Sequence, residues 1–280
     1  MRWKQFFTPV ASIDSQEARS LIALKTPETL TLLDVRQPGE YEDGHLPGAR
    51  LIPLPELNQR LSELDPRQPT LVYCAVGGRS RVAAQILSAK GFETVYNLTG
   101  GFKAWQGKAA YGAEESGLSL FTGDESLEQI LGTAYSLESG LEDFYRSMAD
   151  QAANAEAAQL FRKLAEIETR HQDRILEAYR TLTGKTADRN SFENAVVGPV
   201  VEGGMTTEQY VAMFRPDPES PVEIVDVAMS IEAQALDLYQ RAAGRLSAEP
   251  AKTVLQQIAN EEQAHLEQLG ALIDRITASK

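Results

Sequence analysis

"ANEEQAHLEQ", Ala259 to Gln268, is the stretch that decides the fold of the second half of this chain. It places His265 three residues after Glu262, so on a helix the two side chains share one face and lie one turn apart. The same Glu-x-x-His spacing occurs 94 residues earlier, where "EIETRH" contains Glu168 and His171. One such pair is common on a solvated helix face, but two copies indicate a repeated structural unit.

The repeat extends beyond these two pairs. "AYSLESGLEDFY" begins at Ala134 and "AMSIEAQALDLY" begins at Ala228, again 94 residues apart, with Ala, Ser, Glu, Asp and Tyr at matching places. Their glutamates, Glu138 and Glu232, each lie 30 residues before the glutamate of the next Glu-x-x-His pair. The second half of the chain therefore contains a duplicated helical hairpin.

Helical phase decides which way these acids point. In the first helix the apolar stripe runs from Leu127 to Ala134 at intervals of three and four residues, and Glu138 takes the next place in it. The other candidate acids and both histidines interrupt their own apolar stripes in the same way. Each is therefore expected to face the interior of a helical bundle.

Four long helical segments and one long connection predict the fold of this half. The segments are residues 124–150, 152–182, 221–246 and 249–278, and residues 183–220 connect the second to the third. Short, long and short connections among four amphipathic helices predict an all-α four-helix bundle with one crossover.

The inward-facing groups predict a metal centre. They are Glu138, Glu168, His171, Glu232, Glu262 and His265. Ionised carboxylates are not buried without a compensating charge, which metal ions supply. A Glu from each of two helices plus Glu-x-x-His from each of the other two is the arrangement of carboxylate-bridged two-metal centres in bundles. Carboxylate with imidazole suits iron, and manganese is also acceptable.

Two tyrosines follow the same helix faces. Tyr145 and Tyr239 each lie seven residues after the first glutamate of their copy of the repeat. Core packing, a hydrogen bond to a ligand carboxylate, or radical quenching would each explain a tyrosine at this place.

The first hundred residues have a different pattern. "TLTLLDVR" (Thr29 to Arg36), "TLVYCA" (Thr70 to Ala75) and "ETVYNL" (Glu93 to Leu98) are short apolar runs, which predict buried strands. Between the last two, "RSRVAAQILSAKGF" predicts a helix that ends near Gly91. Strand, helix and strand in this order predict an α/β domain, with a parallel sheet and flanking helices.

The only cysteine, Cys74, lies where a predicted strand meets the predicted helix. The residues that follow it are Ala75, Val76, Gly77, Gly78 and Arg79. A glycine-containing turn at a helix start presents backbone N–H groups, which lower the pKa of a thiol and can hold an anion or a persulfide. The alternative is an inert buried thiol.

Charge and composition limit the partners. Residues 1–110 contain 13 Lys and Arg against 11 Asp and Glu, whereas the remaining residues contain 14 against 29. Such an acidic second half argues against nucleic acid as a partner. No apolar run approaches the roughly 18 residues of a membrane span. The start of the sequence lacks the apolar stretch of a secretory signal, so a cytoplasmic protein is expected.

The first domain resembles the rhodaneses. The resemblance covers residues 10–107 and rests on "LLDVRQPGEYEDGHLPGARLIPL", "YCAVGGRS" and "VYNLTGGFKAW" in that order. It implies that Cys74 accepts sulfur from a sulfane-sulfur donor, becomes a persulfide and passes the sulfur to a thiol acceptor. Arg79 is expected to be catalytic together with Cys74, Ala75 to Gly78 form the active-site loop, and Asp34 and Arg36 have a supporting role.

The loop departs from the pattern of many rhodaneses, which place a basic residue directly after the cysteine. Here Ala75 and Val76 are neutral, so a small dianion such as thiosulfate has less to bind. The hypothesis that follows is that polysulfide or a protein persulfide is the better donor.

The second domain, residues 124–278, resembles the rubrerythrin group of the ferritin-like proteins. The resemblance implies a centre of two iron ions that reduces hydrogen peroxide, and a homodimer. The chain has one cysteine and so lacks a four-cysteine rubredoxin module, which implies an external electron donor such as a rubredoxin. Ala235 stands where rubrerythrins tend to have a further glutamate, and the resulting six-ligand set equally resembles a ferroxidase centre.

The sequence thus predicts a fusion of two domains. The expected limits are residues 1–107 for the rhodanese-like domain, 108–123 for a linker, and 124–280 for the bundle. The expected function is sulfur transfer combined with reduction of peroxide or oxygen. The alternatives are a bundle that oxidises and handles iron, and a sensor of sulfur and oxidant that does not turn over.

Overall fold

The chain forms two structural units. The computed structural model describes residues 10–24, 29–123, 125–152, 155–186, 212–215, 217, 219–246 and 249–278. It divides into Met1–Glu115 and Ser116–Lys280. Most of the predicted crossover, residues 183–220, lies outside the described residues. Among the helices described, none combines the length and the apolar character needed to cross a bilayer.

The first unit is an α/β domain built on a parallel sheet, which confirms the predicted fold class. Its strands follow the order β1-β5-β4-β2-β3. All four described strand pairings are parallel. The elements are β1 (Ala11–Ile13), α1 (Ser15–Ala23), β2 (Thr31–Asp34), α2 (Pro38–Glu42), β3 (Arg50–Leu51), β4 (Thr70–Tyr73), α3 (Gly78–Ala89) and β5 (Val95–Leu98).

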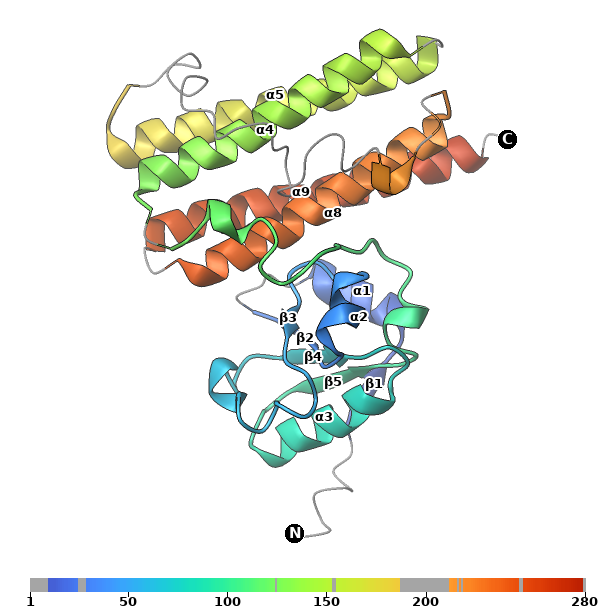
Figure 1. Cartoon of the computed structure of the whole chain (residues 1–280), viewed down its shortest axis with the longest axis vertical. Coiled ribbons are helices and arrows are strands. Elements are labelled where there is room, and N and C mark those ends of the chain that lie inside the picture. The colour runs from blue at the N-terminus through green and yellow to red at the C-terminus, as the bar shows by residue number, and fades with distance from the viewer. Residues whose placement is uncertain are drawn as a thin grey trace. The chain divides into compact units, whose positions relative to one another are not determined.

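Side-chain alternation along the strands gives the sheet two apolar faces. Leu33 and Val72 pack in one core cluster with the buried residues of α3. Leu71 and Tyr73, from the same central strand as Val72, pack in a second cluster on the other face. Helix α3 covers one face of the sheet, and α1 and α2 cover the other (Figure 1). A sheet covered on both faces explains why the central strands are continuous apolar runs.

The topology places the cysteine loop at the carboxyl edge of the sheet. Cys74 directly follows β4, and the neighbouring strands β2 and β5 end at Asp34 and Leu98. Parallel neighbours end at the same edge, where ligands of open α/β sheets usually bind.

The second unit is a helical bundle of two antiparallel hairpins. Its long helices are α4 (Leu127–Gln151), α5 (Ala155–Thr183), α8 (Pro221–Arg245) and α9 (Glu249–Ala278). Helix α4 lies beside α5, and α8 lies beside α9 (Figure 1). Ser126 begins α4 with a reciprocal capping box to Gln129. The predicted all-α fold class is confirmed.

Residues 108–123, predicted as a linker, pack in part against each unit. Ala110 pairs with His45 in an isolated bridge of the first unit. Leu118 and Phe121 are buried in the bundle core, where the Phe121 ring lies 6.4 Å from that of Tyr239. Arg241 donates hydrogen bonds of 3.2 Å to the Ser116 carbonyl oxygen. The burial of Leu118 and Phe121 could not be predicted from the sequence, because this segment has no clear hydrophobic period.

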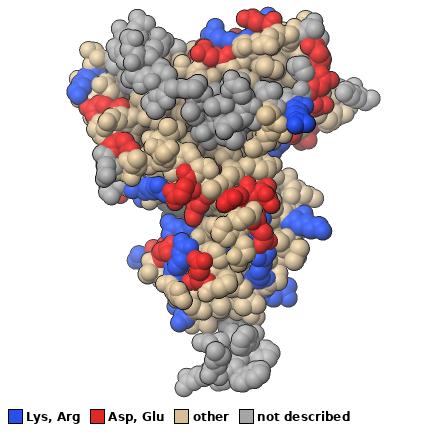
Figure 2. Space-filling view, in the orientation of Figure 1, with Lys and Arg blue, Asp and Glu red and all other residues tan. Residues whose placement is uncertain are grey.

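The surface charge is mixed on the face that Figure 2 shows. There, Lys and Arg side chains are interspersed with Asp and Glu over the first unit. The predicted exclusion of nucleic acid, which rests on the acidic composition of the second half, stays a prediction.

Candidate functional site

The Cys74 thiol lies in a cradle of hydrogen-bond donors. The Gly77 N–H donates to Cys74 Sγ at 3.1 Å, and the Ser80 hydroxyl lies 3.5 Å from the same sulfur. Gly77 has a φ of +93°, a conformation that favours glycine and turns this N–H toward the sulfur. Gly101 also requires glycine, because a Cβ there would lie 2.2 Å from the Cys74 carbonyl oxygen.

These donors control the ionisation of the thiol. Burial raises the pKa of Cys74, but hydrogen bonds from Ser80 and from the backbone around Val76 and Gly77 outweigh it and lower the pKa below its ordinary value. A lowered pKa increases the thiolate fraction at neutral pH, and the thiolate is the nucleophile. The loop therefore favours a reactive thiol over an inert one.

Ser80 connects the sulfur to the buried Asn97, and through it to the exposed Ser12, a chain of polar groups that the sequence did not reveal. Its hydroxyl donates to Asn97 Oδ1 at 2.6 Å, and Asn97 Nδ2 donates to Ser12 Oγ at 3.2 Å. A hydroxyl has one proton, so Ser80 donates either to Asn97 or to the sulfur. The shorter distance assigns the proton to Asn97 until Cys74 carries a charge.

Replacing Ser80 by alanine is expected to raise the pKa of Cys74. The variant loses a donor to the thiolate, and a hydrogen bond to a charged group is worth about 1.5–3 kcal/mol, which corresponds to roughly one to two pKa units. The measurement is the rate of alkylation by iodoacetamide against pH, with Ser88→Ala on the same helix as the control. An unchanged midpoint in Ser80→Ala would contradict the role given to this hydroxyl.

Arg79 is held by a carboxylate that the sequence analysis did not foresee. Its guanidinium makes two hydrogen bonds to Glu40, of 2.7 and 2.6 Å. Arg79 lowers the pKa of Glu40 to about 2, and Glu40 together with Cys74 raises the pKa of Arg79. Arg79 therefore lies in the electrostatic range of the sulfur, but its charge is shared with Glu40.

Asp34 and Arg36 form a buried ion pair that contacts the cysteine loop through Phe102. Both are buried, and Arg36 Nη2 lies 2.6 Å from Asp34 Oδ2. The guanidinium stacks 4.4 Å from the centre of the Phe102 ring. The Phe102 N–H in turn donates to the Cys74 carbonyl oxygen at 2.7 Å. These contacts connect Asp34 and Arg36 to the loop through Phe102, and their supporting role stays a prediction.

The outer lip of the loop is neutral. Val76 is 64% exposed, Gly78 is exposed and Ala75 is half-buried. An exposed valine at the entrance offers no charge to a small dianion, as the sequence predicts.

In the bundle, the structure brings all six predicted metal-site residues together. His171 Nδ1 lies 3.0 Å from Glu138 Oε2, 3.1 Å from Glu168 Oε2 and 3.8 Å from Glu262 Oε1. His265 Nδ1 lies 3.4 Å from Glu262 Oε2 and 3.8 Å from Glu232 Oε2. Two groups have the spacing of metal ligands, one of Glu138, Glu168 and His171 and one of His171, Glu262 and His265.

The four carboxylates are almost completely removed from solvent. Glu138, Glu168 and Glu262 have no exposed surface, and Glu232 has 1%. Burial raises the pKa of Glu168 and of Glu232, and repulsion from neighbouring carboxylates raises both further. So many buried acids without a full set of positive partners would be costly in a purely structural core.

The two histidines differ in charge. Burial would lower the pKa of His171, but the Glu138 and Glu168 carboxylates outweigh it and raise the pKa to about 11. Burial and the neighbouring His171 cation lower the pKa of His265 to about 4. Their Nε2 atoms lie 3.2 Å apart, so a protonated His171 donates to a neutral His265. Protons thus balance part of the acidic charge in the cluster.

The two predicted tyrosines are both buried, but their described contacts differ. The Tyr239 hydroxyl donates to Glu138 Oε1 at 3.2 Å, which links it directly to the cluster. The Tyr145 ring packs with its centre 5.4 Å from that of Phe144. Tyr239 thus makes the carboxylate hydrogen bond that was one of the explanations offered for it, and the roles of both tyrosines stay predictions.

A buried polar pair lies beside the cluster, and the sequence did not reveal its Gln172 member. Gln172 Nε2 donates to Glu142 Oε2 at 2.6 Å, and Arg146 Nε donates to Glu142 Oε1 at 2.8 Å. Glu142 follows Glu138 by one turn, and Gln172 is adjacent to His171. The repeat obscured this pair, because the equivalent of Glu142 in the second copy is Leu236.

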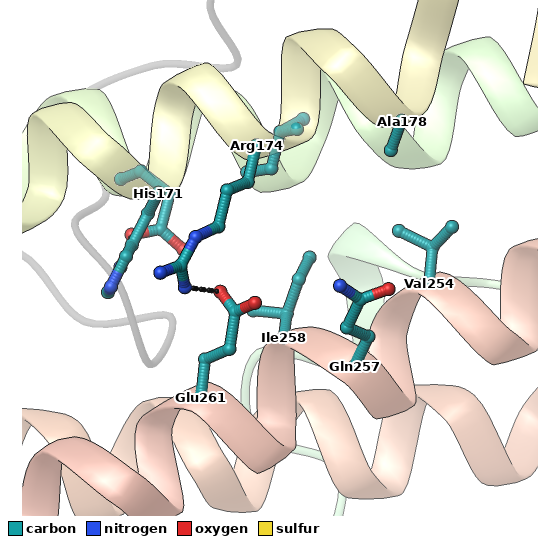
Figure 3. Close-up of a pocket in the computed structure, with 9 residues that line it drawn as sticks. His171, Arg174, Ala178, Val254, Gln257, Ile258 and Glu261 are labelled. Carbon is teal, nitrogen blue, oxygen red and sulfur yellow. Dashed lines mark hydrogen bonds and ion pairs between the residues drawn. The ribbon is translucent and has the colours of Figure 1, made fainter. Parts of the chain in front are cut away.

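A small pocket between α5 and α9 reaches the cluster at Glu138 and His171. The volume of this pocket is about 30 Å³. At its edge the Arg174 guanidinium forms an ion pair with the Glu261 carboxylate at 2.7 Å. Figure 3 marks this contact with a dashed line. The pocket has room for water or a molecule of similar size.

Known protein families account for both units. The family model for the rubrerythrins matches residues 129–273, more than half of the chain and all of the six-residue cluster. The chain belongs to the rubrerythrin family. The model for the rhodanese-like domain matches residues 16–108, which include Cys74 and its loop. This rubrerythrin therefore also carries a rhodanese-like domain, and the predicted fusion is confirmed.

Individual relatives match shorter stretches of this rubrerythrin. The uncharacterized protein YqhL of Bacillus subtilis is 51% identical over 77 residues, which are 28% of this chain and 61% of that protein. Rhodanese-like/PpiC domain-containing protein 12 of Arabidopsis thaliana is 38% identical over 104 residues, which are 35% and 34% of the two chains. The chain thus spans less than two thirds of either relative.

Among solved structures, a rhodanese-like domain protein from Staphylococcus aureus is 27% identical. The match covers 37% of this rubrerythrin and 100% of that chain, with a TM-score of 0.34.

Membership of the rubrerythrin family implies a di-iron site, and the donor set of the cluster fits one. The Glu168 and Glu232 carboxylates are buried and include oxygen atoms that accept no hydrogen bond within the described residues. Such oxygen atoms are the ligands expected around a metal ion. Four carboxylates and two imidazoles also match the number and type of donors in carboxylate-bridged two-metal centres.

Proposed function

We propose that the rhodanese-like domain transfers sulfane sulfur through a persulfide on Cys74. The observation that supports this most is the environment of the Cys74 sulfur. The Gly77 N–H donates to it, the Ser80 hydroxyl lies 3.5 Å away, and the pKa of the thiol is lowered. The thiolate attacks the outer sulfur of the donor, the S–S bond of the donor breaks, and the donor leaves with the electron pair. A thiol acceptor then takes the outer sulfur and regenerates the thiolate.

The proposed donor is polysulfide or a protein persulfide. Because Ala75 and Val76 leave the entrance neutral, and Arg79 shares its charge with Glu40, a small dianion has few cations to bind.

The expected result is a kcat/KM for polysulfide that exceeds that for thiosulfate by about tenfold or more. Val76→Arg is expected to narrow this difference by improving thiosulfate, because it adds a cation at the exposed entrance. Steady-state rates with each donor measure both effects, and Val82→Arg, on an exposed position of α3, is the matched control. A parent that prefers thiosulfate would contradict the proposed donor class.

We further propose that the bundle holds two iron ions, or manganese, through Glu138, Glu168, His171, Glu232, Glu262 and His265. Metal ions bound there would supply electrons for the reduction of peroxide or oxygen. The observation that supports the site is the set of four buried carboxylates that converge on two imidazoles. Tyr239 fixes Glu138 by its hydrogen bond, and the four helices exclude bulk water from the carboxylates.

Metal loading is expected to depend on pH. The pKa of His171, raised to about 11 by the Glu138 and Glu168 carboxylates, means that the metal-free cluster carries a proton at neutral pH, which His171 must lose to bind metal. The raised pKa values of Glu168 and Glu232 act in the same direction. Lowering the pH favours the protonated cluster, so affinity falls as pH falls, by about tenfold per unit for each proton released. Titration with Fe²⁺ or Mn²⁺ in weak buffer is expected to release at least one proton per chain. Metal binding without proton release would contradict the predicted coupling between metal loading and deprotonation of the cluster.

Turnover experiments discriminate the proposed activity from its alternatives. Fast reduction of hydrogen peroxide by NADH, with an added electron carrier such as a rubredoxin and its reductase, is the expected result. Oxidation of Fe²⁺ with retention of the ferric product would support a ferroxidase instead, and loading without turnover would support a sensor. The external donor, a homodimer and a cytoplasmic location belong to this proposal.

A further inference from the structure

A second, larger hollow reaches the cluster from the other direction along α5 and α9. Its inner end is lined by Glu232 and His265. By the same measure, the volume of this hollow is about 200 Å³, whereas that of the pocket beside Arg174 is about 30 Å³. Hydrogen peroxide needs little more room than water, about one water-sized sphere. The hollow is therefore much larger than peroxide requires.

The walls of the hollow are apolar. Leu160, Leu164 and Ile167 line it from α5, at helical spacings of four and three residues. Leu269 and Leu272 line it from α9. Leu164 and Leu269 are buried and the other three are half-buried, so apolar side chains line the hollow from the cluster outward, and the exposed Gln268 is a polar residue among them. Such walls favour hydrocarbon over water.

The outer part of the hollow carries positive charge. Lys163 and Arg275 line it, and both side chains are exposed. Within the described residues, Lys163 has no ion-pair partner. Arg275 follows His265 by ten residues on α9, which places it about 15 Å farther along the helix axis. Apolar walls therefore separate the cationic end from the buried carboxylates.

This arrangement fits one class of small molecule. A carboxylate headgroup would pair with Lys163 and Arg275, and an acyl chain would lie along the leucines. The reverse orientation would bring the headgroup to Glu232, in a cluster of four buried acids that would repel it.

We propose that the hollow binds an unbranched acyl-chain carboxylate, with its headgroup at Lys163 and Arg275 and its chain directed toward Glu232 and His265. Resting on the proposed peroxide reduction, this makes the hydroperoxide of such an acid a substrate beside hydrogen peroxide. In that reaction the O–O bond breaks, two electrons come from the external carrier, two protons are taken up, and the products are the alcohol and water.

The first test is binding of dodecanoate to the purified full-length protein, measured by isothermal titration calorimetry. Lys163→Glu reverses the charge at the outer end, and Ala271→Trp places a large ring in the hollow from an exposed position. Each is expected to weaken binding at least tenfold. Arg162→Glu, an exposed change on α5 outside the hollow, is the matched control and is expected to bind as the parent does. A parent that takes up no dodecanoate, or a Lys163→Glu variant that binds equally well, overturns the proposal.

The second test separates this inference from the proposed function. With linoleate hydroperoxide as substrate, Lys163→Glu is expected to raise KM at least tenfold, and KM for hydrogen peroxide is expected to stay unchanged. If the protein reduces hydrogen peroxide but does not bind dodecanoate, the proposed function is supported and the proposed acyl-chain binding in the hollow is overturned. Dodecanoate binding with the expected variant pattern, but no reduction of either peroxide, would support the hollow and overturn the proposed function.

Discussion

The Glu262→Ala variant is expected to retain less than about one iron ion per chain, where the parent retains about two. Glu262 is the carboxylate that approaches both histidines, at 3.8 Å from His171 Nδ1 and 3.4 Å from His265 Nδ1. Removing it deprives the group of His171, Glu262 and His265 of its only acid. Loss of a residue that merely orients a ligand, by comparison, costs about 10–100-fold in metal affinity. The measurement is metal analysis after iron loading and gel filtration.

Two further variants make this result interpretable. Glu267→Ala removes an exposed acid from the same helix and is expected to retain iron as the parent does. Glu262→Gln keeps the shape of the side chain, so loss of iron in this variant cannot be attributed to a cavity. If Glu262→Ala and Glu262→Gln are both folded by circular dichroism and both retain two iron ions, Glu262 is not a ligand.

The Cys74→Ala variant is expected to lose sulfur transfer by about a thousandfold or more, because removal of a covalent nucleophile eliminates the reaction path. Mass spectrometry after incubation with polysulfide is expected to show one added sulfur on the parent and none on the variant. Cys74 is the only cysteine of the chain, so no other thiol can take its place.

Iron retention provides the matched control for Cys74→Ala. The chain divides into two units, and Cys74 belongs to the first, so the variant is expected to retain iron as the parent does. In reverse, Glu262→Ala is expected to keep the sulfur-transfer rate. Persulfide-dependent transfer that persists in Cys74→Ala would contradict the assignment of the nucleophile.

The sequence was sufficient for the framework of the bundle because a repeat and a helical period reinforce one another. An offset of 94 residues related Glu138 to Glu232 and Glu168 to Glu262, and phase predicted that all would point inward. The structure places these four carboxylates in the interior, within reach of His171 and His265. Periodicity predicts which face of a helix is buried, and that is the information such a site requires.

Contacts between segments distant in the sequence could not be predicted in the same way. Glu40 pairs with Arg79, and Asn97 accepts from Ser80, because neighbouring strands of the parallel sheet end at one edge. The short strands β1 and β3 were missed because two or three residues carry no period. Leu118 and Phe121 lie in a segment predicted as a linker, and their burial depends on the residues of the bundle core that surround them.

The copies of the repeat also differ where symmetry predicts equality. The Glu138 and Glu168 carboxylates outweigh burial and raise the pKa of His171, whereas burial and the neighbouring His171 cation lower the pKa of His265. Glu142 beside Gln172 has no counterpart at Leu236. Such differences depend on the side chains packed around each position, and a helical period does not contain that information.

The iron content of the purified full-length protein tests the proposed two-metal centre most directly. The measurement is inductively coupled plasma mass spectrometry after anaerobic loading with Fe²⁺ and gel filtration, with protein concentration from amino-acid analysis. The four buried carboxylates and two imidazoles predict about two iron ions per chain. Fewer than one per chain, with manganese loading equally low, would contradict it.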